Sequence, residues 1–303
     1  MELLYLLEKI RMPGLNECML AVTQLGEETA FLAIALIVFW CVDKKRGYFL
    51  MAVGFAGTIL NQFLKLLFRV PRPWVLDPDF TILEQAREAA AGYSFPSGHT
   101  QMAVGLFGTL AVTSRKKGFR ILCWVLAFLV SFSRMYIGVH TPYDVITSVG
   151  IALAMVYGLR KPVMEGDRKE MKLVITGVLL MALGLLAYVR CWNFPADMDP
   201  HNLESGMKNA YTMTGSLMGV ALVYWLERKY VNFDTKAIWW AQLLKVFLGI
   251  AVVLVVKEGL RAPLETVFGV YPGRAVRYFL IVVTAGFLWP MSFRWLSKLG
   301  VKK

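Results

Sequence analysis

Long apolar runs alternate with short charged segments along most of this chain. Nine of the runs approach or reach the length that a helix needs to cross a bilayer whose hydrocarbon layer is about 30 Å thick. They cover residues 29–42, 48–68, 99–114, 120–137, 143–159, 173–190, 210–226, 238–256 and 277–293. Residues 1–28 mix charged residues with leucines, a pattern typical of an amphipathic helix in the membrane interface. The sequence therefore predicts an all-α integral membrane protein with about nine transmembrane helices.

Composition and charge agree with a membrane protein. The 303 residues are 57% hydrophobic, whereas a soluble domain is about 45–50% apolar. The net charge of +12 could indicate a nucleic-acid partner. However, the basic residues gather in alternate loops: one set of loops holds nineteen Lys and Arg against six acids, and the opposite side holds thirteen against fifteen. This asymmetry orients a protein in the plasma membrane, so we expect an outer N-terminus, a cytoplasmic C-terminus and no nucleic-acid partner.

The domain organisation follows from the same pattern. We predict an interfacial segment at 1–28, a core of six spans at 29–190 and three additional spans at 191–303, with the longest cytoplasmic loop at 160–172. The four cysteines have no spacing typical of metal ligands or of a disulfide framework. We therefore expect no zinc site; we also expect no other metal ion and no cofactor.

Ionisable residues gather at the predicted outer ends of several spans. The set is Lys65, Arg72, His99, Arg134, His140 and Asp144. Each alone has an ordinary explanation: a snorkelling cation, a residue at a helix start, or, for Asp144, a capping box with Thr141. These explanations do not account for three cations and two histidines at one membrane depth, where ionisable groups are costly and are functional candidates.

Such a set suits a phosphate. Three cations and a helix N-terminus bind an anion with several oxygens, and in "PSGH" the backbone at Ser97 and Gly98 and the Ser97 hydroxyl would face the same space. We find no acidic cluster nearby that would hold Mg²⁺. Two histidines supply a nucleophile and a proton donor. Asp144, four residues after His140, is placed to bond one ring nitrogen and leave the other unprotonated.

Three segments together resemble the signature of the type 2 phosphatidic acid phosphatase superfamily. "KLLFRVPRP" fits K-x6-RP, "PSGH" is identical, and "SRMYIGVHTPYD" fits SR-x5-H-x3-D. The resemblance covers residues 29–190. It implies that His140 attacks phosphorus to form a phosphohistidine, that Asp144 orients His140, and that His99 protonates the leaving oxygen. The implied phosphate ligands are Lys65, Arg72, Ser97, Gly98 and Arg134.

We therefore expect a metal-independent phosphatase that acts on a lipid phosphate or diphosphate at the extracytoplasmic leaflet. Phosphatidate, phosphatidylglycerol phosphate and a polyprenyl diphosphate all fit. Alternatives that use the same site are hydrolysis of a soluble sugar phosphate and transfer of the phosphoryl group to another lipid. A different class, an anion-binding transporter, predicts polar residues deep within several spans, whereas here they lie mainly at one edge.

Overall fold

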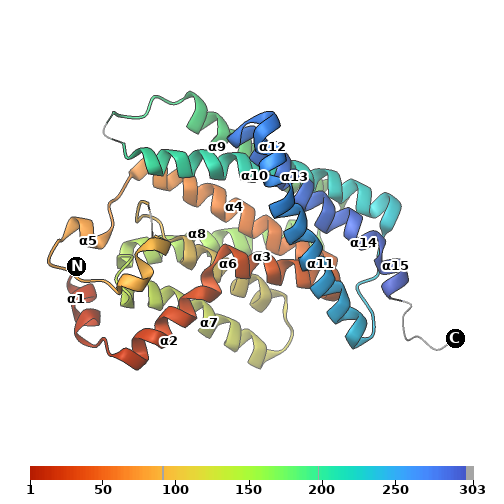
Figure 1. The fold of residues 1–303 in the computed structure, drawn as a ribbon. Coiled ribbons are helices and arrows are strands. Elements are labelled where there is room, and N and C mark those ends of the chain that lie inside the picture. The colour runs from red at the N-terminus through yellow and green to blue at the C-terminus, as the bar shows by residue number, and fades with distance from the viewer. Residues whose placement is uncertain (91, 197, 298–303) are drawn as a thin grey trace. The chain divides into compact units, whose positions relative to one another are not determined.

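The computed structural model describes residues 1–90, 92–196 and 198–297, and within this part the chain forms helices and no strands (Figure 1). The α-helices are α1 (Glu2–Lys9), α2 (Pro13–Thr23), α3 (Glu28–Ile37), α4 (Lys44–Phe68), α5 (Pro73–Leu76), α6 (Gly98–Thr113), α7 (Lys117–Tyr136), α8 (Pro142–Arg160), α9 (Arg168–Cys191), α10 (Pro200–Leu226), α11 (Trp239–Gly259), α12 (Arg261–Phe268), α13 (Val270–Val283), α14 (Trp289–Met291) and α15 (Phe293–Leu296). Single π-helical turns follow α3, α8, α10 and α13, and short 3-10 turns lie at Gln24–Gly26, Glu84–Ala86 and Glu88–Ala90. The lysines at 298, 302 and 303, counted above with the cytoplasmic charges, lie outside the described residues.

Six helical segments in the described part are long and apolar enough to cross a membrane. They are Lys44–Leu76, Lys117–Tyr136, Pro142–Glu165, Arg168–Cys191, Trp239–Phe268 and Val270–Leu296. Pro13–Gly26 and Glu28–Val42, bent by 54° at their junction, make a seventh if they act as one span. The expectation of an all-helical membrane protein is confirmed.

The expected count of nine spans is not confirmed. The predicted third span is α6, which has only 16 residues, or about 24 Å at 1.5 Å per residue. The predicted seventh span is α10, in which Thr212, Thr214 and Ser216 lower the apolar character and are themselves buried. The predicted first span, 29–42, qualifies only together with the helix before it.

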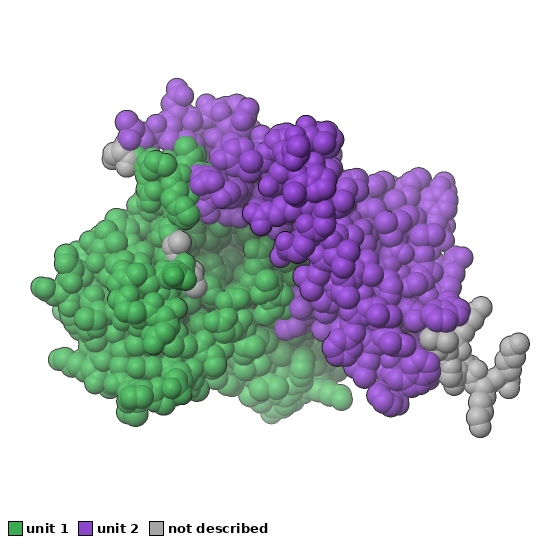
Figure 2. Space-filling view, viewed as in Figure 1, with its two compact units in different colours: residues 1–32, 53–161, 197–203 green, residues 33–52, 162–196, 204–303 purple. Residues whose placement is uncertain are grey.

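The chain forms two compact units (Figure 2). Unit 1 comprises residues 1–32, 53–161 and 197–203, and unit 2 comprises residues 33–52, 162–196 and 204–303.

Helix α6 is the central helix of unit 1. It packs against α7 and α8, and buried residues such as Ala103, Leu106 and Ala111 lie on all of its sides, as expected for a helix enclosed by others. Gly108 admits the Trp124 ring, because a Cβ at this position would lie 3.2 Å from the indole. Small residues thus allow close helix packing, which fixes the N-terminal end of α6 relative to the ends of its neighbours.

The N-terminal helices pack on α7 and on the loop before α6. Helices α1 and α2 both contact α7, and Leu4 is fully buried with Phe80 and Ile82. Arg11 donates from Nε to the Tyr136 carbonyl oxygen (2.9 Å) and from a guanidinium nitrogen to the Thr81 carbonyl oxygen (2.8 Å). These contacts attach the N-terminal segment to the C-terminal end of α7.

Unit 2 is held by close helix contacts and a buried ion pair. At Gly215 and Gly219, α10 lies directly against the backbone of α13, where a Cβ would collide. Lys44 Nζ lies 2.8 Å from the carboxylate of Glu227, which is almost completely buried. The Trp40 indole donates to the Ala285 carbonyl oxygen (2.8 Å).

Candidate active site

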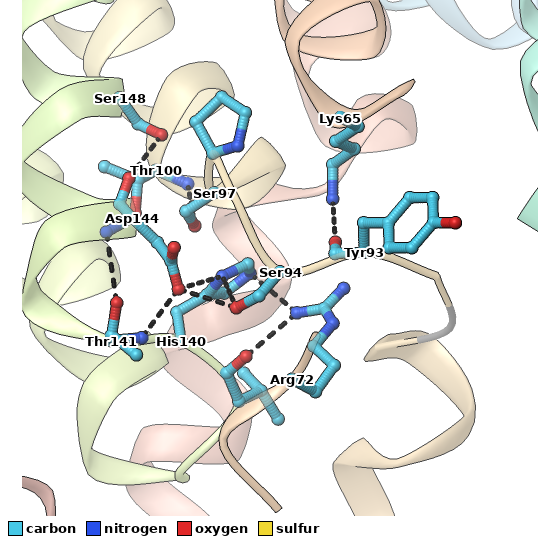
Figure 3. Close-up of polar contacts among 12 residues, drawn as sticks. Lys65, Arg72, Tyr93, Ser94, Ser97, Thr100, His140, Thr141, Asp144 and Ser148 are labelled. Atoms are coloured by element: carbon cyan, nitrogen blue, oxygen red, sulfur yellow. Dashed lines mark hydrogen bonds and ion pairs between the residues drawn. The ribbon is translucent and has the colours of Figure 1, made fainter. Parts of the chain in front are cut away.

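The last turns of α4 and the turn after it place two cations. Lys65 lies on the last turn of α4, and its Nζ donates to the Tyr93 carbonyl oxygen at 2.6 Å (Figure 3). Arg69 then adopts a left-handed conformation with φ of 51°, and its N–H still bonds the Lys65 carbonyl. This conformation ends the helix. The chain turns there and places Arg72 directly before α5.

Arg72 connects three segments of the site. Its Nε donates to the Gly92 carbonyl oxygen (2.8 Å) and its Nη1 to the Val139 carbonyl oxygen (2.9 Å). The same Nη1 lies 3.0 Å from Nε2 of His140. A guanidinium has only donors, so Nε2 of His140 must accept, and the proton of the neutral ring must be on Nδ1.

His140 is held on both ring nitrogens. Its Nδ1 lies 3.4 Å from Oδ2 of Asp144, and both side chains are buried. Burial, followed by the nearby cations Arg72, Arg134 and Lys65, lowers the pKa of His140 well below its usual range. The ring is therefore neutral at neutral pH, with an unprotonated Nε2, which is the form that a nucleophile requires.

Asp144 caps α8 and faces His140 with the same oxygen. Oδ2 accepts the Thr141 backbone N–H at 2.7 Å, and the Thr141 hydroxyl accepts from the Asp144 N–H, which completes a capping box. Oδ2 also accepts the Ser94 hydroxyl at 2.6 Å. The capping and orienting roles considered separately for Asp144 thus coexist in one carboxylate.

The turn after α7 fixes the separation of Arg134 and His140. The Arg134 carbonyl accepts the backbone N–H groups of Val139 and His140, both at 3.2 Å. Gly138 has φ of +88°, a conformation that favours glycine. A Cβ there would also lie 3.0 Å from the Phe80 ring. The turn therefore holds the cation at the end of α7 and the histidine beyond it in fixed register.

A cavity of about 420 Å³ in unit 1 joins most of the predicted site residues. Its lining includes Lys65, Arg72, Gly98, His99, Arg134 and His140. The Arg134 side chain is 1% exposed. One of its terminal nitrogens donates to the Thr23 hydroxyl at 2.7 Å, and its Nε has no hydrogen-bond partner within the described residues. Three cations and two histidines from distant parts of the chain therefore face one space.

The two remaining predicted residues, Ser97 and Asp144, are outside the cavity lining. Ser97 is fully buried and caps α6, with its Oγ accepting the Thr100 N–H at 3.4 Å. Its own N–H bonds the Asp144 carbonyl at 3.3 Å, so this amide is engaged between α6 and α8. Gly98 lines the cavity, and a Cβ built there would lie 3.9 Å from an oxygen of Asn61, the nearest contact outside its own helix among the described residues. The role of Ser97 as a phosphate ligand stays a prediction.

Several residues that complete the site were not predicted. Ser94 bonds Asp144, Thr23 bonds Arg134, and Asn61 donates to the Pro96 carbonyl at 3.3 Å. Short polar residues of this kind occur throughout the sequence, so none of them carries a distinctive signal. Asn61 is the exception among the three. It lies four residues before Lys65 on the same face of α4, so helical periodicity could have pointed to it.

The charges define what the cavity can do. Lys65, Arg72 and Arg134 line this cavity, and the carboxylates of Glu27 and Glu28 line it as well, so three cations stand against two anions. A buried excess of positive charge is unfavourable until an anion neutralises it. Among the described residues, no three His, Cys, Asp or Glu side chains are grouped so as to hold a metal ion. The arrangement can bind a multiply charged oxyanion beside an unprotonated imidazole.

Comparison with known proteins identifies two family segments. Residues 45–164 match the PAP2 superfamily, and residues 211–302 match the transmembrane extension of PAP2 superfamily phosphatases. The first match contains Lys65, Arg72, Arg134, His140 and the rest of the predicted site residues. No solved structure matches the chain.

Three relatives are each similar to less than half of this chain. Undecaprenyl-diphosphatase BcrC of Bacillus subtilis is 30% identical over 40% of this chain and 62% of its own length. Phosphatidylglycerophosphatase B of the same organism is 29% identical over 49% of this chain and 75% of its own length. An undecaprenyl-diphosphatase of Sulfolobus acidocaldarius is 31% identical over 48% of this chain and 69% of its own length. The aligned region thus spans less than two thirds of BcrC.

Proposed function

The chain belongs to the PAP2 superfamily, and on that premise we propose that it is a membrane phosphatase that hydrolyses a lipid phosphate or diphosphate through a phosphohistidine. One observation carries the proposal: the neutral His140, with Nε2 unprotonated, lines the same cavity as His99 and three cations. The names of the relatives, two undecaprenyl-diphosphatases and a phosphatidylglycerophosphatase, support a substrate with a lipid tail.

In the first step, the lone pair on Nε2 of His140 attacks phosphorus. The bond from phosphorus to the leaving oxygen breaks, and its electron pair stays on that oxygen. His99 donates a proton to it, which yields the free alcohol from a lipid phosphate or the lipid monophosphate from a diphosphate. Arg72, which bonds Nε2 in the free protein, turns its N–H to a phosphoryl oxygen. Asp144 stabilises the positive charge that develops on the His140 ring.

In the second step, water displaces His140 from phosphorus. His99 takes a proton from water while the water oxygen attacks phosphorus, and the P–N bond breaks with its electrons returning to Nε2 of His140. Inorganic phosphate leaves, and both histidines are ready for another turnover. Lys65, Arg72 and Arg134 stabilise the charge on the phosphoryl oxygens in both steps.

The charge distribution supports an extracytoplasmic site. The cavity residues lie at the ends of α4, α7 and α8 that are opposite the basic loops at 115–120 and 160–172. By the positive-inside rule, those basic loops face the cytoplasm. We therefore propose that the protein lies in the plasma membrane and acts on the outer leaflet, with the substrate tail in the bilayer.

A phosphate-release assay tests the proposal. Purified protein in detergent, without added metal, should release phosphate from phosphatidate, and H140A should release none. Brief labelling stopped with alkaline detergent should trap an acid-labile, base-stable phosphoprotein in the native protein and not in H140A. H201A is the matched control, because His201 is exposed at the start of α10; it should keep normal activity. Binding of phosphatidate without any phosphate release would instead favour an anion-binding transporter.

A further inference from the structure

The cavity continues beyond the cations along α4. Thr58, Asn61 and Gln62 line it together with Lys65, and their spacing places all four on one helix face. Thr58 is seven residues from Lys65, or about 10 Å along the axis at 1.5 Å per residue. Polar side chains are costly inside a membrane helix and are functional candidates there. A polar stripe thus leads from the proposed phosphate site into unit 1.

Gln101 faces this stripe from α6. The side chain lines the cavity and is only 3% exposed, yet its Oε1 has no hydrogen-bond partner within the described residues. Gly57 provides the room, because a Cβ at this position would collide with the Gln101 amide. A buried acceptor without a partner is unfavourable, because it loses its hydrogen bonds to water and gains none in return. A ligand that bonds Oε1 would remove this cost.

The start of α3 and the residue before it also line the cavity. Glu27, Glu28 and Thr29 line the same cavity, and all three precede the residues that match the PAP2 superfamily. Two carboxylates next to a phosphate site do not serve the phosphate, which they repel. Glu27 already accepts a hydrogen bond from the Thr29 hydroxyl at 3.3 Å, and a carboxylate has further lone pairs for an uncharged donor beside it.

We propose that this extension binds a hydroxyl group on the leaving alcohol, with Gln101 as a specificity-determining residue. The inference rests on the proposed phosphatase function. A carboxamide offers both donors and an acceptor, and a hydroxyl can donate to Oε1 while accepting from an amide N–H. The favoured substrate is therefore a phosphate ester whose alcohol carries a free hydroxyl near the ester carbon. A plain hydrocarbon alcohol would leave Oε1 unpaired.

Two substrates that differ in one group test the proposal. The first is an ether-linked lysophosphatidate with a free hydroxyl on the middle glycerol carbon, and the second lacks only that hydroxyl. A third carries an amine at that carbon and tests whether the carboxylates select a cation instead. A polar site that pairs with a hydroxyl discriminates against its absence, so native protein should show a kcat/KM at least about tenfold higher for the first substrate.

The variant Q101M should bring the kcat/KM ratio of the first two substrates close to one, mainly by slowing the hydroxylated one. The matched control is T109V. Thr109 is also a buried α6 residue, and its hydroxyl oxygen has no hydrogen-bond partner among the residues that the structure describes, but it does not line the cavity. T109V should keep the native ratio. Since the ratio is measured within each preparation, loss of folded protein does not affect it.

The outcomes separate the two proposals. The hydroxyl site is overturned if native protein releases phosphate with a kcat/KM ratio near one for the first two substrates. It is also overturned if Q101M keeps the native ratio. In both cases the proposed phosphatase function stands. Preference for the amine over the hydroxyl also overturns the hydroxyl site. Release from none of the three substrates, nor from phosphatidate, overturns the phosphatase itself.

Discussion

Replacing Asp144 by asparagine tests the central contact of the site with little change in shape. Oδ2 accepts the Ser94 hydroxyl at 2.6 Å and the Thr141 N–H at 2.7 Å, and it lies 3.4 Å from Nδ1 of His140. The substitution D144N removes the charge from all three interactions. If the new amide presents its NH₂ to Nδ1, the ring proton must move to Nε2. That nitrogen would then carry an N–H against the N–H of Arg72.

The expected losses of stability and of phosphorylation rate both follow from these contacts. Hydrogen bonds to a charged group contribute about 1.5–3 kcal/mol, and neutral ones about 0.5–1.5 kcal/mol. With two short bonds made neutral, the free energy of unfolding should fall by roughly 2 kcal/mol. The wrong tautomer should lower the rate of His140 phosphorylation by about 10⁴-fold, as for the equivalent change in a Ser-His-Asp triad.

The rate is best measured by single-turnover labelling with a radioactive lipid phosphate, and stability by thermal unfolding in the same detergent. The control is S148A, because the Ser148 hydroxyl bonds the Asp144 backbone carbonyl (2.8 Å) and not its carboxylate. It should lose some stability and keep its labelling rate. If folded D144N is labelled within about twofold of the native rate, Asp144 does not set the protonation of His140 and the reasoning fails.

Two further predictions concern the cations. R72K should lower kcat/KM by about 10²-fold or more. The reason is that one ammonium cannot replace a planar guanidinium that reaches Gly92, Val139 and His140. A native kcat/KM in steady-state kinetics would contradict this. Inorganic phosphate at 100 times its Kd should stabilise the native protein by about 2.7 kcal/mol in thermal unfolding, since it neutralises Lys65, Arg72 and Arg134, whereas chloride at equal ionic strength should not. An equal effect of both salts would show that the cavity does not select phosphate.

The hydrophobic pattern of the sequence correctly predicted features that depend on a single helix. Every predicted span contains a helix, because a long apolar run satisfies its backbone only in that form within a membrane. The count of spans was less reliable, since the short α6 and the polar-containing α10 are stabilised by burial among other helices, which no single run reveals. The motif spacings predicted which charged residues lie near one another at the helix ends, because each spacing covers only one helix end or one turn.

The sequence by itself determined that this protein is helical and apolar, which ends of its helices carry the cations and histidines, and which family signature they form. Those properties depend on neighbours within a few turns of the chain. Only the tertiary structure decided that Ser94 bonds Asp144 and that Arg72 fixes the tautomer of His140. It also decided that Oε1 of Gln101, a cavity-lining residue, has no hydrogen-bond partner within the described part of the chain. These contacts join residues far apart in the chain, and their geometry depends on how whole helices pack.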